Sequence, residues 1–440
     1  MDNGSRNDAA DCNSSGGTEV TAAADDLSEV FFPLKDSVFD LRVGAPGPDI
    51  LCKLAPMFTE ATRERMAAEA EHGHLFQYGP EPGQRSFRRA LAHFLSQEYA
   101  GQPPVDEEEL FVTTGATNGL FMICTLLLHP TAVVFVENPT YFIGLKLLSQ
   151  DLGLRVVPVP MNNDGIDIDA LERCVKEATT VVKGNQSDNG KFHCMLYTIP
   201  NFHNPTGITF TTSTCREIIR ISGEQRMLVV CDDVYNLLDY RGLDKPQTSR
   251  LKALDTNDLV ISNGTFSKIL APGLRLGWLE LPRRLLPWFT GSGVLLSGGC
   301  QNNYTSGILH SLINNGVLSG LLNQLRQTYG VRMNASYACL SKNLPAGWRL
   351  IHPGGGYFLW IQADTDLTEF CQKLTDEFGV MVITGRETCP FTHLGVEMAD
   401  GNLSHAFRIS IAHYEQEKLV EACSAICRAA NEHVKDMANV

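Results

Sequence analysis

The sequence predicts an α/β fold: a large domain with a mostly parallel sheet covered by helices, plus a smaller α+β domain. Two observations predict it. Between about residues 111 and 280, short apolar runs rich in Val, Ile and Tyr alternate with helical patterns, and several runs are apolar on both faces. Strands of that kind are typical of a parallel sheet with both faces covered. After residue 300, a long helical pattern leads into short strands and further helices, which is typical of an α+β unit.

The strands of the large sheet are expected where apolar runs are bounded by Gly, Pro, Asn or Asp. These runs are 111–114, 133–138, 154–160, 194–200, 227–232, 259–264 and 276–280. Helical patterns at 117–128, 141–150 and 212–222 supply crossovers between them. In such a sheet, ligand-binding residues follow the carboxyl ends of the strands. Polar clusters at those ends are therefore the first candidates for a site.

The smaller unit begins with a helical pattern from Ser306 to Ala346 that is interrupted near Gly316. Its expected strands are 349–353, 358–362, 381–384 and 407–412, and its further helices are 366–377 and 415–434. The polar stretch 183–191 is rich in Gly and Asn, which predicts an exposed loop.

Charge and cysteine content exclude several classes of protein. The chain has 36 basic and 50 acidic residues, a net charge of −14, whereas binders of nucleic acid or anionic membranes need a basic face. The longest apolar run, 120–128, is about half of what a bilayer crossing requires, and the polar N-terminus has no targeting pattern. The 13 cysteines are odd in number, scattered and without a CxxC pair, so no metal site is expected. We expect free thiols in a reducing compartment, hence a cytoplasmic protein.

The strongest local signal is the segment Thr265-Phe266-Ser267-Lys268, which follows a predicted strand. An isolated lysine is usually a solvated surface charge. Here two hydroxyls precede the lysine, and Arg275 follows it after a Pro-Gly turn. Hydroxyls and a guanidinium suit a phosphate ester, and an amine beside them can form an imine with an aldehyde. A cofactor that carries both a phosphate ester and an aldehyde is pyridoxal 5′-phosphate (PLP).

With this segment the sequence resembles the fold-type I PLP-dependent enzymes, specifically the class I/II aminotransferases and their aminoadipate/kynurenine/aromatic aminotransferase-like branch. Family motifs occur in order from about Leu41 to Tyr414. The resemblance implies the PLP-dependent transferase fold of type I. It also implies that Lys268 carries the aldimine with the cofactor and that Thr265, Ser267 and Arg275 hold its phosphate.

The resemblance also implies a domain organisation. Residues 1–28 form a flexible, polar tail, and residues 29–68 form an N-terminal segment that joins the small domain. Residues 69–305 form the large PLP-binding domain, and residues 306–440 form the small C-terminal domain.

Further motifs match residues that contact the cofactor in the family. In TTGATNGL (113–120) a strand ends and a helix begins, and Gly115, Ala116 and Thr117 correspond to phosphate ligands there. Tyr141, after the next strand, corresponds to an aromatic residue that stacks on the pyridine ring. Taken alone, the first motif is equally a helix cap and Tyr141 an ordinary core tyrosine.

A second pair of motifs concerns the electronics of the ring. A pyridine ring acts as an electron sink when a carboxylate keeps its nitrogen protonated. The family spacing D-x-x-Y selects Asp232 for that role and leaves Asp233 as a structural acid; Asn204 and Tyr235 would hydrogen-bond the ring hydroxyl. Asn204 lies 28 residues before Asp232 (232 − 204 = 28), which fits two successive strands of one sheet. Residues 204–207 alone are also compatible with a simple turn.

The resemblance assigns the substrate contacts to Gly44, Asn204 and Arg408. An arginine on an apolar strand needs an anionic partner, which is either a substrate α-carboxylate or a neighbouring acid. At Gly44 a close approach of the backbone excludes a side chain. Tyr78 matches a tyrosine that in many relatives reaches the phosphate of the neighbouring subunit, which implies a homodimer with shared active sites.

These residues predict a PLP-dependent aminotransferase. It would transfer an amino group from an L-amino acid to a 2-oxo acid, with 2-oxoglutarate as the expected acceptor, in a ping-pong cycle through the Lys268 aldimine. A PLP-dependent lyase or decarboxylase on the same fold stays open, because no local motif excludes it. A transcriptional regulator built on an aminotransferase-like domain is disfavoured, because only about 28 residues precede the expected fold, too few for a winged-helix domain, and the net charge is −14. A non-enzymatic pseudo-transaminase is disfavoured, because Lys268, Asp232, Arg275 and Arg408 are all present.

Overall fold

The computed structural model describes residues 38–182, 190–241, 249–390 and 403–438. The predicted tail 1–28 and most of the predicted loop 183–191 lie outside the described residues.

The large sheet has eight strands in the order β2-β9-β8-β7-β6-β3-β4-β5. The strands are β2 (Leu110–Thr113), β3 (Leu128–Asn138), β4 (Arg155–Asn162), β5 (Gly165–Ile166), β6 (Phe192–Thr198), β7 (Leu228–Asp232), β8 (Val260–Thr265) and β9 (Gly277–Glu280). Strands β4, β3, β6, β7 and β8 pair in parallel, whereas β9 is antiparallel to both of its neighbours. The seven predicted strands are confirmed, and the short β5 is an addition to them.

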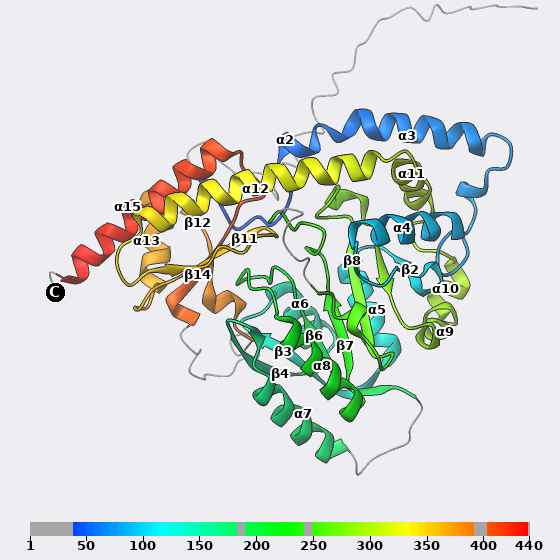
Figure 1. The fold of residues 1–440 in the computed structure, drawn as a ribbon, viewed down its shortest axis with the longest axis horizontal. Coiled ribbons are helices and arrows are strands. Elements are labelled where there is room, and N and C mark those ends of the chain that lie inside the picture. The colour runs from blue at the N-terminus through cyan, green and yellow to red at the C-terminus, as the bar shows by residue number, and fades with distance from the viewer. Residues whose placement is uncertain (1–37, 183–189, 242–248, 391–402, 439–440) are drawn as a thin grey trace, which may run out of the picture.

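Both faces of this sheet are buried, as the apolar runs predict. In β7, Leu228 and Val230 pack in one apolar cluster, together with Ile123 of helix α5 (Ala116–Leu127). The alternate residues Val229 and Cys231 pack in another, against α7 (Ile168–Val182) and α8 (Thr212–Gln225). Figure 1 shows α7 and α8 on one side of the strands and α5 on the other. The sheet thus forms the middle of a three-layer unit.

Other helices of this part differ from the expectation in detail. The predicted helix 141–150 is α6 (Phe142–Lys146) continued by a π-helical turn over 147–151. The predicted helix 117–128 ends at Leu127, because Leu128 begins β3. The other helices that precede residue 300 are α2 (Pro48–Leu51), α3 (Leu54–Glu69), α4 (Arg85–Glu98), α9 (Leu286–Thr290) and α10 (Gly293–Gly298).

The C-terminal part holds a four-stranded antiparallel sheet in the order β10-β11-β14-β13. Its strands are β10 (Arg349–Leu350), β11 (Phe358–Gln362), β13 (Ile383–Thr384) and β14 (Ala406–Ser410). Its helices are α11 (Asn303–Asn314), α12 (Val317–Asn343), α13 (Thr368–Phe378) and α15 (Gln416–Ala438). Gly316 separates α11 from α12 with φ of 71°, so the predicted interruption is confirmed.

The N-terminal segment joins this C-terminal part through main-chain contacts. Strand β1 (Phe39–Asp40) pairs in parallel with β12 (Val380–Met381), and the Leu41 carbonyl accepts a hydrogen bond from the Ser410 N–H. The predicted strand 381–384 is therefore divided at Val382 between two sheets. The predicted domain boundaries, at 68/69 and 305/306, stay predictions.

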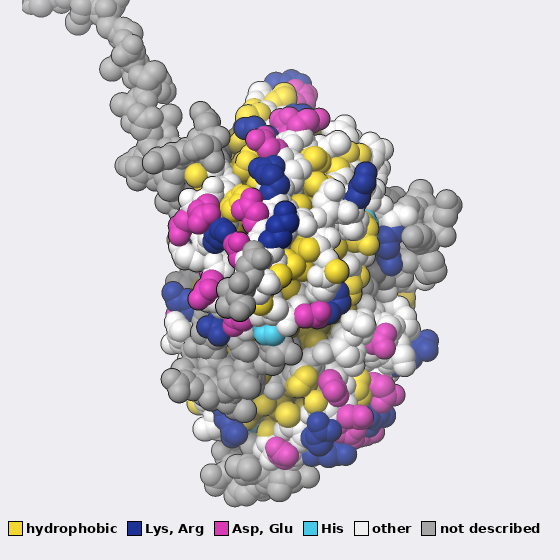
Figure 2. Space-filling view, turned by 90° about the vertical axis from the view of Figure 1, so that its left-hand side faces the viewer, with side chains coloured by type: hydrophobic (Ala, Val, Ile, Leu, Met, Phe, Trp, Pro, Cys, Tyr) yellow, Lys and Arg dark blue, Asp and Glu magenta, His cyan; other side chains and the backbone are white. Residues whose placement is uncertain are grey.

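The surface carries charges of both signs. On the face in Figure 2, acidic and basic side chains are interspersed, with hydrophobic side chains between them. The twelve cysteines of the described residues are free thiols. Of the helices in the described ranges, none is both long and apolar enough to cross a membrane.

A fully buried carboxylate, Glu137, lies at the end of β3. It accepts hydrogen bonds from Thr198 Oγ1 (2.6 Å), the Ile199 N–H (2.8 Å) and Thr140 Oγ1 (3.2 Å), and His203 Nε2 lies 4.0 Å from it. Burial raises the pKa of Glu137 to about 7, although the hydrogen bonds oppose this rise. Between its ordinary pKa and about 7, the folded protein holds a proton that the unfolded chain releases. Protonated Glu137 therefore makes a favourable contribution to the free energy of unfolding, which is complete at low pH and is lost as the pH rises through 7.

We therefore expect Glu137→Gln to gain stability relative to wild type as the pH rises. Between pH 5 and 8 the difference in free energy of unfolding should move in favour of the glutamine by about 2 kcal/mol, because other titrations are common to both proteins. Urea denaturation of the cofactor-free proteins at several pH values measures it. Glu421→Gln, an exposed acid on α15, should show no such trend. A difference independent of pH for Glu137→Gln would contradict the prediction.

Candidate active site

Lys268 lies just beyond the carboxyl end of β8, beside the end of β7. Its Nζ donates a hydrogen bond to the Gly44 carbonyl at 2.7 Å and lies 5.9 Å from the centre of the Tyr357 ring. Burial lowers the pKa of Lys268 to about 8; the positive charges of Arg408 and Arg275 act in the same direction, and the charge of Asp232 opposes it. A lysine with this pKa is partly neutral near pH 7, as a nucleophile or a base must be.

Asp232 is buried at the end of β7 with one oxygen free. The Tyr197 hydroxyl donates a hydrogen bond to Oδ2 at 2.7 Å, while the buried Oδ1 has no partner among the described residues. Burial raises the pKa of Asp232 to about 6. A buried carboxylate oxygen without a donor is costly, so Oδ1 suits a ligand that brings an N–H. The neighbouring Asp233 accepts a hydrogen bond from Ser262 Oγ at 2.5 Å, and its own buried Oδ1 likewise has no partner among the described residues.

An anion-binding arrangement lies where α5 begins. Gly115 is the N-cap of α5 with φ of 100°, and no side chain caps the helix. A Cβ at Gly115 would lie 3.0 Å from Arg275 Nη2, so the guanidinium lies directly against this turn. In the next loop, Thr265 Oγ1 donates to Ser267 Oγ at 2.9 Å. Free helix N–H groups, a guanidinium and two hydroxyls are suitable phosphate ligands, and Ala116 and Thr117 are the first residues of that helix.

Arg408 is a buried cation on β14. Its Nη1 donates to Asn204 Oδ1 at 3.0 Å and its Nη2 to the Arg42 carbonyl at 2.5 Å, and the guanidinium lies 4.1 Å over the Phe358 ring. Burial lowers its pKa to about 10. Among the described residues no carboxylate forms an ion pair with it, and its Nε has no partner. A buried guanidinium in this state suits an anionic ligand better than an internal ion pair.

Gly44 and Asn204 border the same cation. A Cβ at Gly44 would lie 2.9 Å from Phe358 Cζ, beneath the Arg408 guanidinium, which explains the glycine. Asn204 lies beyond the end of β6, Asp232 is the last residue of β7, and β6 pairs in parallel with β7, so the predicted two successive strands of one sheet are confirmed.

Two predicted tyrosines lie at this edge of the sheet. Tyr141 is half-buried before α6, and burial raises its pKa to about 12; the charges of Asp232, Arg408 and Arg275 act on it. Tyr235 is buried, with its ring 5.4 Å from that of Tyr357.

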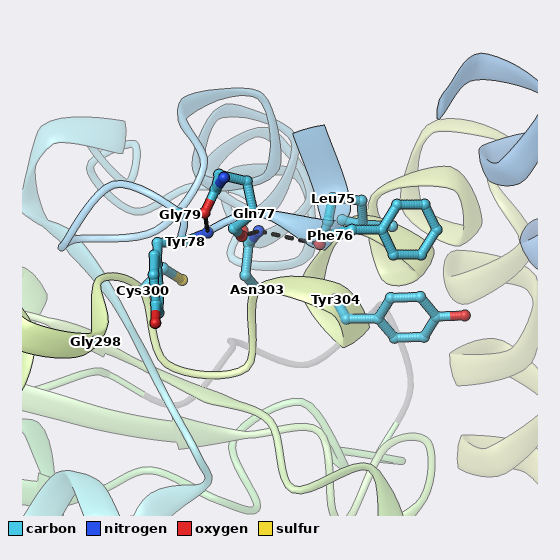
Figure 3. Close-up of a pocket in the computed structure, with 9 residues that line it drawn as sticks. All are labelled: Leu75, Phe76, Gln77, Tyr78, Gly79, Gly298, Cys300, Asn303 and Tyr304. Carbon is cyan, nitrogen blue, oxygen red and sulfur yellow. Dashed lines mark hydrogen bonds between the residues drawn. The ribbon is translucent and has the colours of Figure 1, made fainter. Parts of the chain in front are cut away.

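Tyr78 lies apart from these residues. It is 76% exposed and lines a surface pocket of about 520 Å³. In Figure 3 the rings of Phe76 and Tyr304 lie side by side at one end of this pocket, and Gly79 and Cys300 lie at the other. Within the described chain, Tyr78 is not among the residues around Lys268.

Some contacts of the candidate site had no counterpart in the sequence prediction. The Tyr197 hydroxyl on Asp232 could have been suspected, because a hydroxyl in an apolar strand needs a buried partner. The contacts of the Gly44 and Arg42 carbonyls could not have been predicted, because every residue has a main-chain carbonyl and the residue type does not indicate its partner. Tyr357, whose hydroxyl donates to the Lys268 carbonyl at 2.7 Å, was also missed.

Residues 49–426 match the family model for aminotransferase class I and II. The chain belongs to the class I and II aminotransferase family. The resemblance stated from the motifs and the α/β fold class are thereby confirmed.

Relatives and solved structures extend this result. The aminotransferase is 26% identical over 403 residues to aromatic-amino-acid aminotransferase 1 of Thermococcus litoralis, covering 90% of this chain and 89% of the other. It is also 26% identical over 398 residues to 2-aminoadipate transaminase of Thermus thermophilus, covering 90% of each chain. Its fold matches that of the Pyrococcus horikoshii kynurenine aminotransferase in complex with PMP, with a TM-score of 0.74, 24% identity and coverage of 91% and 92%.

Proposed function

We propose that this aminotransferase binds PLP between Lys268 and Asp232 and transfers an amino group from an L-amino acid to a 2-oxo acid in two half-reactions. One observation carries the proposal: among the described residues, a lysine with a lowered pKa, a buried carboxylate oxygen without a partner and an anion-binding turn lie at one edge of the large sheet, next to a buried guanidinium of β14 that forms no ion pair.

The residues present fit this cofactor. The start of α5, Thr265, Ser267 and Arg275 would hold its phosphate, and Asp232 Oδ1 would accept a hydrogen bond from its ring N–H. Tyr141, Asn204 and Tyr235 would contact the ring. When bound, PLP supplies an aldehyde that condenses with amines and a ring that withdraws electrons from the reacting carbon.

The chain itself supplies binding and proton transfer. Arg408 binds the substrate α-carboxylate through its two-pronged guanidinium, with Asn204 and the Arg42 carbonyl fixing its orientation. Lys268 Nζ then takes the proton from the substrate Cα, for which its lowered pKa is suitable. Gly44 leaves room for the Phe358 ring, on which the Arg408 guanidinium lies.

The finer assignments belong to the same proposal. We take 2-oxoglutarate as the acceptor, a homodimer in which Tyr78 reaches the partner's phosphate site, and a cytoplasmic location. The exposed Tyr78, Phe76 and Tyr304 around one pocket support an interface there. The names of the relatives direct the donor search to aromatic amino acids and 2-aminoadipate.

Single half-reactions test the function. Stoichiometric PLP-loaded protein and one amino acid, without an acceptor, should yield the 2-oxo acid and PMP in equal amounts, and added 2-oxoglutarate should reverse the change. A panel of aromatic and dicarboxylic donors identifies the substrate. Release of ammonia or CO₂ in place of PMP formation would show lyase or decarboxylase chemistry and would overturn the proposal.

A further inference from the structure

A tyrosine–aspartate pair lies buried beneath the proposed cofactor site. Tyr197 is on β6 and Asp232 on the adjacent, parallel β7, where Tyr197 is paired with Val230. Since alternate residues of a strand share a face, Val230 and Asp232 point to the same side of the sheet as Tyr197. The hydroxyl of the fully buried Tyr197 reaches Asp232 Oδ2 at 2.7 Å.

The residues around Tyr197 determine the position of its hydroxyl. A Cβ at Gly144 of α6 would lie only 2.9 Å from Tyr197 Oη, so the glycine makes room for the hydroxyl. The rest of the Tyr197 ring packs in the apolar cluster of this face, where phenylalanine would fill the same volume. The Tyr197 hydroxyl is thus not required for packing, and it donates its hydrogen bond to the Asp232 carboxylate.

The hydrogen bond also determines which carboxylate oxygen is free. With Oδ2 held by Tyr197, only Oδ1 is left without a donor among the described residues. We propose that Tyr197 is a positioning residue: its hydroxyl fixes the Asp232 carboxylate in its ionised form, with Oδ1 presented to a protonated ring nitrogen. This inference rests on the proposed function and assigns to Tyr197 a role in recognising that nitrogen.

Removal of the Tyr197 hydroxyl should lower the affinity only for ligands that have a ring nitrogen. The full-length protein, freed of cofactor, is titrated with PMP and with its 1-deaza analogue, in which carbon replaces the ring nitrogen. Tyr197→Phe should raise the Kd of PMP about tenfold and that of the deaza analogue less than twofold. A purely structural role would weaken both ligands equally. Tyr99→Phe serves as the matched control, because Tyr99 is a buried tyrosine of another apolar cluster and its ring lies against Arg250.

A second variant gives an independent test. In Gly144→Ala the new Cβ would lie 2.9 Å from the Tyr197 hydroxyl and 3.2 Å from Tyr141 Cδ1, while Tyr197 itself is retained. Because Tyr141 would contact the ring of both ligands, both should bind more weakly, and the loss of affinity for PMP should be larger than that for the deaza analogue. If wild-type protein prefers PMP and both variants keep that preference unchanged, the role of Tyr197 is refuted while the proposed function stands. If wild-type protein binds neither ligand, the proposed function fails as well.

Discussion

Replacement of Lys268 by alanine will lower kcat of transamination about 10⁴-fold. The substitution removes the amine that would attach the cofactor and the base that would move the Cα proton. The nearest cations, Arg408 and Arg275, act on Lys268 electrostatically, but a guanidinium is too weak a base to replace it. We therefore expect both chemical roles to be lost together.

Kinetics and covalent labelling check this prediction. Borohydride should fix PLP to a peptide that contains Lys268 in wild-type protein and to no peptide of Lys268→Ala. Lys268→Arg, which keeps the positive charge, should be equally inactive. Lys342→Ala, an exposed lysine on α12, should retain normal kcat and labelling. Retention of more than about a hundredth of kcat in Lys268→Ala would remove this lysine from the chemistry.

Replacement of Arg408 by lysine will raise KM for L-amino acids about 100-fold. A lysine keeps the charge but loses the planar pair of donors that matches a carboxylate, and hydrogen bonds to charged groups are worth about 1.5–3 kcal/mol each. Because Phe358 lies beneath the guanidinium and Asn204 and Arg42 accept its hydrogen bonds, an ammonium would not be held in the same position. We expect kcat to change by less than about tenfold, because Lys268 is untouched.

A substrate without a carboxylate provides the control. We expect a simple primary amine to convert bound PLP to PMP at a low rate in wild-type protein and at the same rate in Arg408→Lys. The ratio of amino acid to amine kcat/KM should therefore fall about 100-fold. An unchanged KM for every amino acid would show that Arg408 does not hold the α-carboxylate.

Much of the fold follows from patterns that are local in the sequence. Runs such as 133–138 and 227–232 are apolar on both faces because helices cover both sides of the sheet, so their burial could be predicted. Residues placed at strand ends, including Asp232 and Lys268, accordingly meet at one edge. By contrast, β1 and β12 are two residues long and are specified by distant main-chain contacts, so the division at Val382 left no signal.

The site shows the same division between local and long-range information. Residue types indicate which side chains can bind a phosphate or a carboxylate, and the family order adds their roles. The pairing of Tyr197 with Asp232 depends on the register of β6 and β7 and on the space at Gly144, which become visible only in three dimensions. The carbonyls of Gly44 and Arg42 act through position alone.

The contact between Arg408 and the Arg42 carbonyl spans 366 residues and has a consequence for synthesis of the protein. At ribosomal rates of about 5 to 20 residues per second, the N-terminal segment waits roughly 20 to 70 seconds before β14 is made. During that interval the large sheet can form, while β1 lacks its partner strand until β12 is made and Lys268 Nζ lacks a fixed carbonyl. A nascent chain thus acquires the guanidinium proposed to bind the substrate carboxylate only near the end of translation. Chains that terminate before residue 408 should be inactive, and those that terminate before β12 would also leave β1 unpaired.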